Sequence, residues 1–124
     1  MLDGCASPIT KHKEKKSLNA FDERIKLYGR MLRWEEFEAA INMIRHKDES
    51  PVDTNLDRFK NLRVTDYEIK KVALDTEYKS AVVEAEITFY FETTNSVKTV
   101  RDVQTWWFFD ESEIWFLDSG LPKF

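Results

Sequence analysis

The chain has 124 residues, 42% of them hydrophobic and 34% charged, with a formal net charge of −4. That length suits one domain with a single core, and the negative charge argues against a general nucleic-acid binder, because phosphate binding requires a positive surface. No apolar run approaches the ~20 residues of a membrane span, and a lone cysteine excludes an internal disulfide and a Cys-rich zinc site.

The sequence LDGC, which ends at Cys5, resembles the end of a bacterial lipoprotein signal, in which the cysteine receives the lipid. Asp3 departs from the small or apolar residue that such signals prefer. The residues that follow are polar, include four lysines and show no apolar periodicity. We expect residues 1–17 to be a disordered tether with Cys5 as the lipid attachment site, ahead of a single domain over residues 18–124. The alternative is a free cysteine in an ordinary tail.

Helical spacing begins at Leu18. A first apolar stripe comprises Phe21, Ile25, Tyr28 and Leu32. A second stripe comprises Trp34, Phe37, Ile41 and Ile44. At about 100° per residue, the second stripe would lie roughly opposite the first on one straight helix. We therefore expect a break near Arg33 and two helices that face the same core.

After a loop, residues 56–62 are expected to form a short helical turn. The segment RVTDYEIKKVALD that follows alternates as a strand does, but its apolar residues change parity midway. A β-bulge around Lys70 and Lys71 would return them to one face of the sheet.

Residues 81–92 alternate cleanly between apolar and polar side chains, which predicts a half-buried strand. A turn centred on Asn95 would pair this strand with the next one and place Val83 opposite Trp107. After a further turn, Phe116 of the last strand would also lie opposite Trp107. We therefore expect an α+β fold, with two N-terminal helices packed on a curved four-stranded antiparallel β-meander.

This order of elements resembles the nuclear transport factor 2-like superfamily, a cone of helices on a strongly curved antiparallel sheet. LYGRMLRWEEFEAAINMIR is similar to its opening helices, and RVTDYEI, AVVEAEITFYFE and EIWFLDSG are similar to its late strands. The resemblance covers about residues 18–120, and the related cystatin-like fold shares much of the same order. It implies a cone that can hold a small apolar ligand. The loop from His46 to Leu62 is short for this family, which implies a shallow cone with a small pocket.

Residues 106–109 are four consecutive aromatic residues, so alternation along a strand requires them to supply both faces of the sheet. In the predicted register Trp107, Phe109 and Phe116 face the helices. The opposite face then carries Trp106, Phe108, Trp115 and Leu117. Exposed apolar patches of this size usually mark contacts, and we expect these four residues to form a homodimer interface. The alternative is that the N-terminal tail or the C-terminal segment GLPKF covers them.

The sequence contains no motif for a metal, a cofactor or a catalytic constellation. His12 and His46 have no partner at metal-ligand spacing, and His46 is best explained as a cation near a helix C-terminus. Enzymes of the resembled superfamily often place an Asp or His with a Tyr inside the cone. The loose candidates here are Asp66, Asp102, Tyr67 and Tyr90. No motif assigns a role to any of them, and an ion pair with the neighbouring Arg101 explains Asp102 more simply.

The expected function is therefore a non-enzymatic binding or assembly module of the bacterial cell envelope, held by a lipid anchor and without a nucleic-acid partner. The alternative is a small pocket enzyme of isomerase or hydratase type that acts on an apolar ligand, and the alternative location is the cytoplasm. A carboxylate buried with a raised pKa would favour the enzyme, because desolvation tunes general bases.

Overall fold

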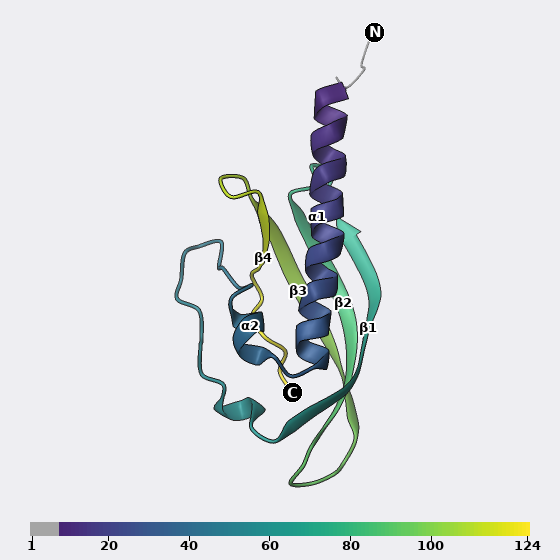
Figure 1. The fold of residues 1–124 in the computed structure, drawn as a ribbon, viewed down its shortest axis with the longest axis vertical. Helices are drawn as coiled ribbons and strands as arrows, with labels where there is room; N and C mark the ends of the chain where they lie inside the picture. Colours follow the sequence, from purple (N-terminus) through teal and green to yellow (C-terminus); the bar gives the residue numbers. More distant parts are fainter. Residues whose placement is uncertain (1–7) are drawn as a thin grey trace.

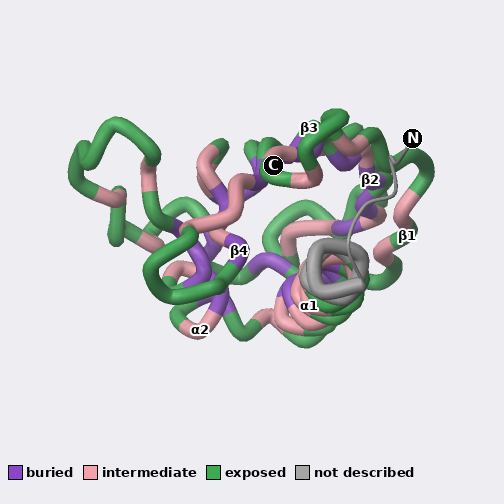
Figure 2. Tube along the Cα trace, turned by 90° about the horizontal axis from the view of Figure 1, so that it is seen from above, coloured by how far each residue is buried: buried purple, intermediate pink, exposed green. Residues whose placement is uncertain are grey.

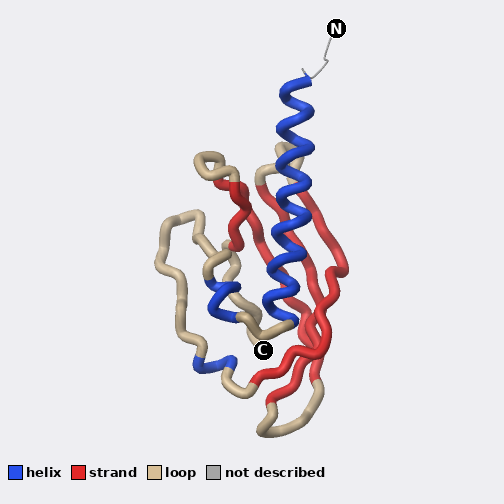
Figure 3. The backbone as a smooth tube through the Cα atoms, viewed as in Figure 1, coloured by secondary structure: helices blue, strands red, loops and turns tan. Residues whose placement is uncertain are grey.

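The computed structural model describes residues 8–124 and shows two helices packed on one face of a four-stranded antiparallel sheet (Figure 1). The helices are α1 (Pro8–Arg33) and α2 (Phe37–Ile41), and a short 3-10 helix covers Asp57–Phe59. The strands are β1 (Leu62–Leu74), β2 (Ser80–Phe91), β3 (Lys98–Phe109) and β4 (Ile114–Leu117). Each strand pairs with its neighbours in the chain, in the order β1-β2-β3-β4 (Figure 3). The predicted α+β class and the four-stranded meander are confirmed.

Helix α1 begins at Pro8, before the start at Leu18 that apolar spacing predicted. Lysine and glutamate favour helices and proline is common at the first helical position, so this stretch can extend the helix without an apolar face. The predicted tether therefore overlaps α1 up to Ser17, whereas Cys5 lies outside the described residues. The apolar stripe of α1 is buried as predicted. Its members Phe21, Ile25, Tyr28 and Leu32 are each at most 3% exposed.

The predicted break between the helices lies just after Arg33. Glu35 adopts a φ of 58° there, and its carboxylate accepts a hydrogen bond of 2.9 Å from the backbone N–H of Val64, which ties the break to β1. Phe37 of the second apolar stripe enters the core. Trp34 was assigned to the same stripe, but it is 67% exposed because it lies in the break and not on α2.

The core lies between the helices and the sheet, which curves around them (Figure 2). β2 contributes a continuous apolar row. This row consists of Ala81, Val83, Ala85, Ile87 and Phe89. The C-terminal segment closes one end of the core, since the ring of Phe124 lies 4.8 Å from that of Phe89 and 5.7 Å from that of Phe59. GLPKF therefore packs on the helix-facing side of the sheet and does not cover the opposite side.

Two of the predicted strand alignments are confirmed. In β1, Ile69 pairs with Ala85 but Lys71 pairs with Glu84, which is the expected bulge. A further irregularity between Val64 and Asp66 was not predicted. The β3–β4 register places Phe116 opposite Trp107 and Trp115 opposite Phe108, as expected.

The predicted register between β2 and β3 is wrong. Val83 lies opposite Gln104 and not opposite Trp107. β2 ends at Phe91 and β3 begins at Lys98, so the connection is longer than a tight turn. Within it, the backbone N–H groups of Thr94 and Asn95 both bond to the carbonyl of Phe91. The resulting shift is an odd number of residues, and such a shift moves every side chain of β3 to the other face.

The predicted interface residues are consequently core residues. Trp106, Trp115 and Leu117 are each at most 1% exposed, and Phe108 lies on the same side of β3. Helix α1 covers them, since the ring of Phe21 lies 4.7 Å from Trp115 and the ring of Tyr28 meets Trp106 edge-on at 5.5 Å. The indole N–H of Trp115 also donates to the carbonyl of Ser17 at 3.1 Å. These residues therefore fill the space that the prediction assigned to Trp107, Phe109 and Phe116.

Candidate functional site

Polar side chains from β1, β3 and α1 meet on the helix-facing side of the sheet. Tyr67 comes from β1, Asp102 and Gln104 occupy successive inward positions of β3, and Tyr28 comes from α1. Tyr28 and Gln104 are fully buried, whereas Tyr67 and Asp102 are partly exposed. We call these four residues the inner polar cluster. A molecule that approached from solvent would meet Tyr67 and Asp102 first.

The side-chain amide of Gln104 organises the inner polar cluster. Its Oε1 accepts a hydrogen bond of 3.0 Å from the indole N–H of Trp106. Its Nε2 donates to the hydroxyl of Tyr67 at 2.8 Å and to Oδ2 of Asp102 at 3.0 Å. An indole can only donate, so Oε1 must face Trp106 and both amide protons must face the other two residues. Trp106 thereby fixes the orientation of the amide.

Part of the hydrogen-bonding capacity of the cluster is unused within residues 8–124. The oxygen of Tyr67 accepts from Gln104, which leaves the proton of that hydroxyl free to donate. The hydroxyl of Tyr28 is buried and bonds to no described residue. The carboxylate of Asp102 accepts one bond from Gln104 and has room for more. The phenol proton of Tyr67 and a carboxylate oxygen of Asp102 are therefore available to a bound molecule, whereas the hydroxyl of Tyr28 is enclosed.

Burial raises the pKa values of the three titratable residues of the inner polar cluster. Desolvation raises the pKa of Tyr67 to about 12. Desolvation, followed by the charge of Asp102, raises the pKa of Tyr28 well above its usual 10. Desolvation also raises the pKa of Asp102, and the hydrogen bond from Gln104 opposes this shift. Both tyrosines are therefore neutral hydrogen-bond donors at physiological pH.

Replacing Asp102 by asparagine should make the protein more stable at pH 7. The pKa of Asp102 is raised in the folded state, so the folded chain holds its proton at pH values where the unfolded chain, with a pKa of about 3.9, has lost it. The wild type therefore loses stability as the pH rises from about 4 through the folded pKa, and the variant lacks this loss. Urea unfolding at several pH values between 3 and 7 measures the difference.

Asp66→Asn is the matched control, because it removes the same charge from an exposed position. It should not reproduce the gain in stability of Asp102→Asn, because an exposed carboxylate pays no desolvation cost. Equal stability curves for the wild type and Asp102→Asn between pH 4 and 7 would show that Asp102 carries no desolvation cost.

Small residues on both sides make room for the ring of Tyr67. Ala85 lies between Ile69 and Asp102 in one row of paired residues across three strands. On the other side the ring contacts Gly29 of α1, where an added Cβ would lie only 2.6 Å from Cε1 of the tyrosine. The hydroxyl of Tyr67 can therefore reach across from β1 to Gln104 on β3.

Of the four candidates named from the sequence, the structure brings together Tyr67 and Asp102 alone. Asp66 is exposed, and Tyr90 occupies an outward position of β2. The neighbour of Asp102, Arg101, points to the outer face and bonds to Glu84 there, so the expected surface ion pair is wrong. Sequence reasoning missed Tyr28, which it counted as an apolar stripe residue, and Gln104, which the wrong register placed outside.

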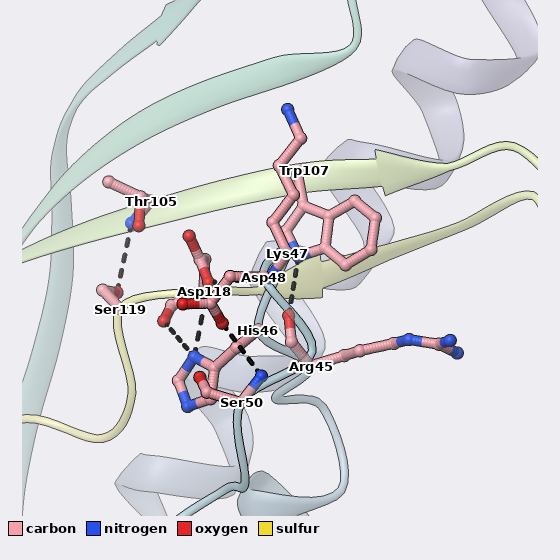
Figure 4. A network of polar contacts seen from close by, with 9 residues as sticks. All are labelled: Arg45, His46, Lys47, Asp48, Ser50, Thr105, Trp107, Asp118 and Ser119. Carbon is pink, nitrogen blue, oxygen red and sulfur yellow. Dashed lines mark hydrogen bonds and ion pairs between the residues drawn. The ribbon is translucent and has the colours of Figure 1, made fainter.

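His46 belongs to a second network, at the edge of β4 (Figure 4). Its Nδ1 lies 2.8 Å from the carbonyl oxygen of Asp118, so this nitrogen carries the proton and donates. The carboxylate of Asp118 accepts from the backbone N–H of Lys47 at 3.1 Å. The network ties the segment after α2 to the segment after β4. His46 lies beyond the end of α2, so the C-terminal dipole of that helix does not explain its position.

The opposite face of the sheet carries a smaller set of rings, Trp107, Phe109 and Phe116, which we call the outer aromatic cluster. Its members pack on one another, with ring centroids 5.6 to 6.4 Å apart. Arg45 covers part of it, since its guanidinium lies 4.1 Å from the ring of Phe109 and its carbonyl accepts from the indole of Trp107 (Figure 4). The cluster is thus half-buried within one chain.

An open depression of about 590 Å³ lies between the start of α2 and the 3-10 helix. Phe37 and Phe59 form its apolar wall, and Glu36 and Glu38 are exposed at its rim. No member of the inner polar cluster lines it. We therefore place the candidate site at the cluster, where polar groups with free hydrogen-bonding capacity converge.

No helix in residues 8–124 is long and apolar enough to cross a membrane. The same part of the chain contains no group of three or more His, Cys, Asp or Glu residues that could hold a metal ion. Comparisons with protein-family models, with curated proteins and with solved structures find no match.

Proposed function

We propose that this protein binds a small, largely apolar molecule through the inner polar cluster. The hydroxyl of Tyr67 would donate to a carbonyl or hydroxyl oxygen of the ligand, and Asp102 would accept from a donor group beside it. Apolar side chains flank these two residues, with Ile69 on β1 and Val100 on β3 partly exposed next to them. The proposal includes the nuclear transport factor 2-like cone, whose interior would be this site.

The observation that supports this proposal is that the inner polar cluster destabilises the folded protein. A buried hydroxyl without a partner, as at Tyr28, destabilises a protein by about 1 to 3 kcal/mol. Burial also disfavours the charged form of Asp102. Apolar residues of similar size would avoid both costs. Proteins retain such local conflicts chiefly at functional sites.

Nuclear magnetic resonance of the four tryptophan indole N–H groups tests the proposal. Titration with a panel of small cyclic ketones and alcohols should shift the indole signal of Trp106, which bonds to Gln104, and leave that of Trp34 unchanged. Tyr67→Phe keeps the ring and removes the donor, so it should weaken binding about fivefold, the value of one hydrogen bond of about 1 kcal/mol.

Tyr90→Phe is the matched control for this measurement, because it removes the same group from an outward position of β2. It should leave the affinity unchanged. A panel that shifts no Trp106 signal, or equal affinities for wild type and Tyr67→Phe, would contradict the assignment of the ligand site.

The second candidate function is a small pocket enzyme of isomerase or hydratase type, and the raised pKa of Asp102 favours it. A carboxylate with a raised pKa is a stronger base, and the neutral Tyr67 beside it can donate to a developing oxyanion. Incubation with a cyclic ketone in heavy water distinguishes the two functions. An enzyme would introduce deuterium next to the carbonyl and lose this ability in Asp102→Asn, whereas a binding module would introduce none.

The cell-envelope location and the homodimer stay proposals. The location depends on the resemblance of the sequence before Cys5 to a lipoprotein signal. A dimer interface through the sheet would use the outer aromatic cluster, because the residues first assigned to it lie in the core.

A further inference from the structure

Helix α1 extends beyond the body of the protein at one end (Figure 1). Its first described contacts with the sheet are those of Ser17 and Phe21 with Trp115. The part before Ser17 projects past the β1–β2 and β3–β4 turns at the same end of the molecule (Figure 1). At 1.5 Å per residue, the stretch from Pro8 to Ser17 is about 14 Å long.

Charge is distributed unevenly between this projection and the body. Residues 8–17 contain four lysines and one glutamate. Lys15 and Lys16 are both exposed. Residues 18–124 contain 21 acidic and 15 basic residues, so the body has an excess of negative charge. The turn between β3 and β4, at the end from which the helix projects, carries Asp110, Glu111 and Glu113.

We propose that the projecting end of α1 is a contact site for an anionic lipid surface. Each lysine near such a surface strengthens binding roughly fivefold, the equivalent of about 1 kcal/mol. The acidic body would be repelled, but charges interact weakly beyond the Debye length of about 8 Å at physiological salt. A helix of about 14 Å holds the body beyond that distance while the lysines nearest its tip lie at the headgroups.

A membrane fits this projection better than a nucleic acid does. A planar surface meets the tip of the helix alone, whereas a long polyanion would also approach the acidic turns around its base. The sequence that resembles a lipid attachment motif also precedes this end of the helix. The inference depends neither on lipidation nor on a ligand at the inner polar cluster.

The test is co-sedimentation of the full chain, carrying Cys5→Ser to prevent lipid attachment, with vesicles in 0.15 M salt. We expect binding to phosphatidylcholine vesicles that contain 30% phosphatidylglycerol and none to phosphatidylcholine alone. Replacing Lys11, Lys13, Lys15 and Lys16 by glutamine, a good helix former, should weaken binding by at least about twentyfold, because the two lysines nearest the tip each contribute roughly fivefold.

The matched control replaces four exposed lysines of the body, Lys47, Lys60, Lys71 and Lys98, by glutamine and changes the net charge equally. It should bind anionic vesicles as the parent chain does. The proposal is overturned if the Cys5→Ser chain does not bind anionic vesicles, or if the control loses as much affinity as the helix variant. It is also overturned if a short DNA duplex binds the chain more tightly than the vesicles do at the same salt.

Discussion

Replacing Trp106 by alanine is expected to remove most of the stability of the fold. The indole is 1% exposed and packs edge-on against Tyr28, so the change leaves a large cavity under α1. Truncations of this kind cost about 3 to 5 kcal/mol. The variant also leaves Oε1 of the buried Gln104 without its donor, which adds a further penalty. Domains of this size are stable by about 5 to 15 kcal/mol, so a large share is lost. Urea unfolding followed by circular dichroism measures it.

Trp34→Ala is the control, because this ring is 67% exposed and its loss should change stability by less than about 0.5 kcal/mol. Trp107→Ala tests the assignment of faces. Trp107 is half-buried on the outer face, so its replacement should cost clearly less than that of Trp106. If Trp107→Ala proved the more destabilising of the two, the β2–β3 register would be the one predicted from a turn centred on Asn95.

Where the sequence predicted the fold correctly, the prediction depended on a local sequence pattern that no other pattern contradicted. The apolar stripe of α1 repeats at helical spacing and is buried throughout. The change of parity in β1 predicted a bulge at Lys70, and β1 skips that residue in its pairing. A short turn left little freedom in the β3–β4 register. In each case a local pattern or a short connection was enough to predict the arrangement.

The β2–β3 register was predicted from a turn centred on Asn95, and it failed because the connection is longer than a tight turn. The polarity of β3 could not correct the error, because it contradicts the burial of that strand. Val103 is 46% exposed while Gln104 is 0% exposed, so alternation alone favours the wrong face. Asp102, with a pKa raised by desolvation, lies on the same inward side. The polar residues at these inward positions of β3 are members of the candidate site. Local patterns are expected to conflict with the fold at functional positions, and this conflict coincides with the candidate site.

The members of the candidate site differ in how readily they could be identified from the sequence. Tyr67 and Asp102 could be named from the sequence, because carboxylates and tyrosines are the usual participants in acid–base chemistry. Tyr28 shares the spacing of apolar residues, and its unpartnered hydroxyl is evident only once α1 is placed on the sheet. Gln104 could be recognised only from the correct register.

Replacing Gly29 by alanine should destabilise the protein, against the ordinary preference of helices. In a helix interior, alanine is favoured over glycine by about 1 kcal/mol. At this position the new Cβ would lie 2.6 Å from Cε1 and 2.9 Å from Cδ1 of Tyr67, so the ring must move. Overpacking of this kind typically costs about 1 to 3 kcal/mol, which outweighs the helix preference. The displaced hydroxyl would also lose its bond to Gln104. Thermal unfolding measures the net effect.

A double-mutant cycle separates the clash from any other effect of the substitution at Gly29. In a Tyr67→Ala background the ring is absent, so the same change should stabilise the protein by about 1 kcal/mol through helix preference alone. The effect of the alanine therefore reverses sign between the two backgrounds. If Gly29→Ala stabilised the wild type as well, the ring of Tyr67 would have space to move away. The close contact with α1 would then not be what holds its hydroxyl at Gln104, and the geometry of the inner polar cluster would need another cause.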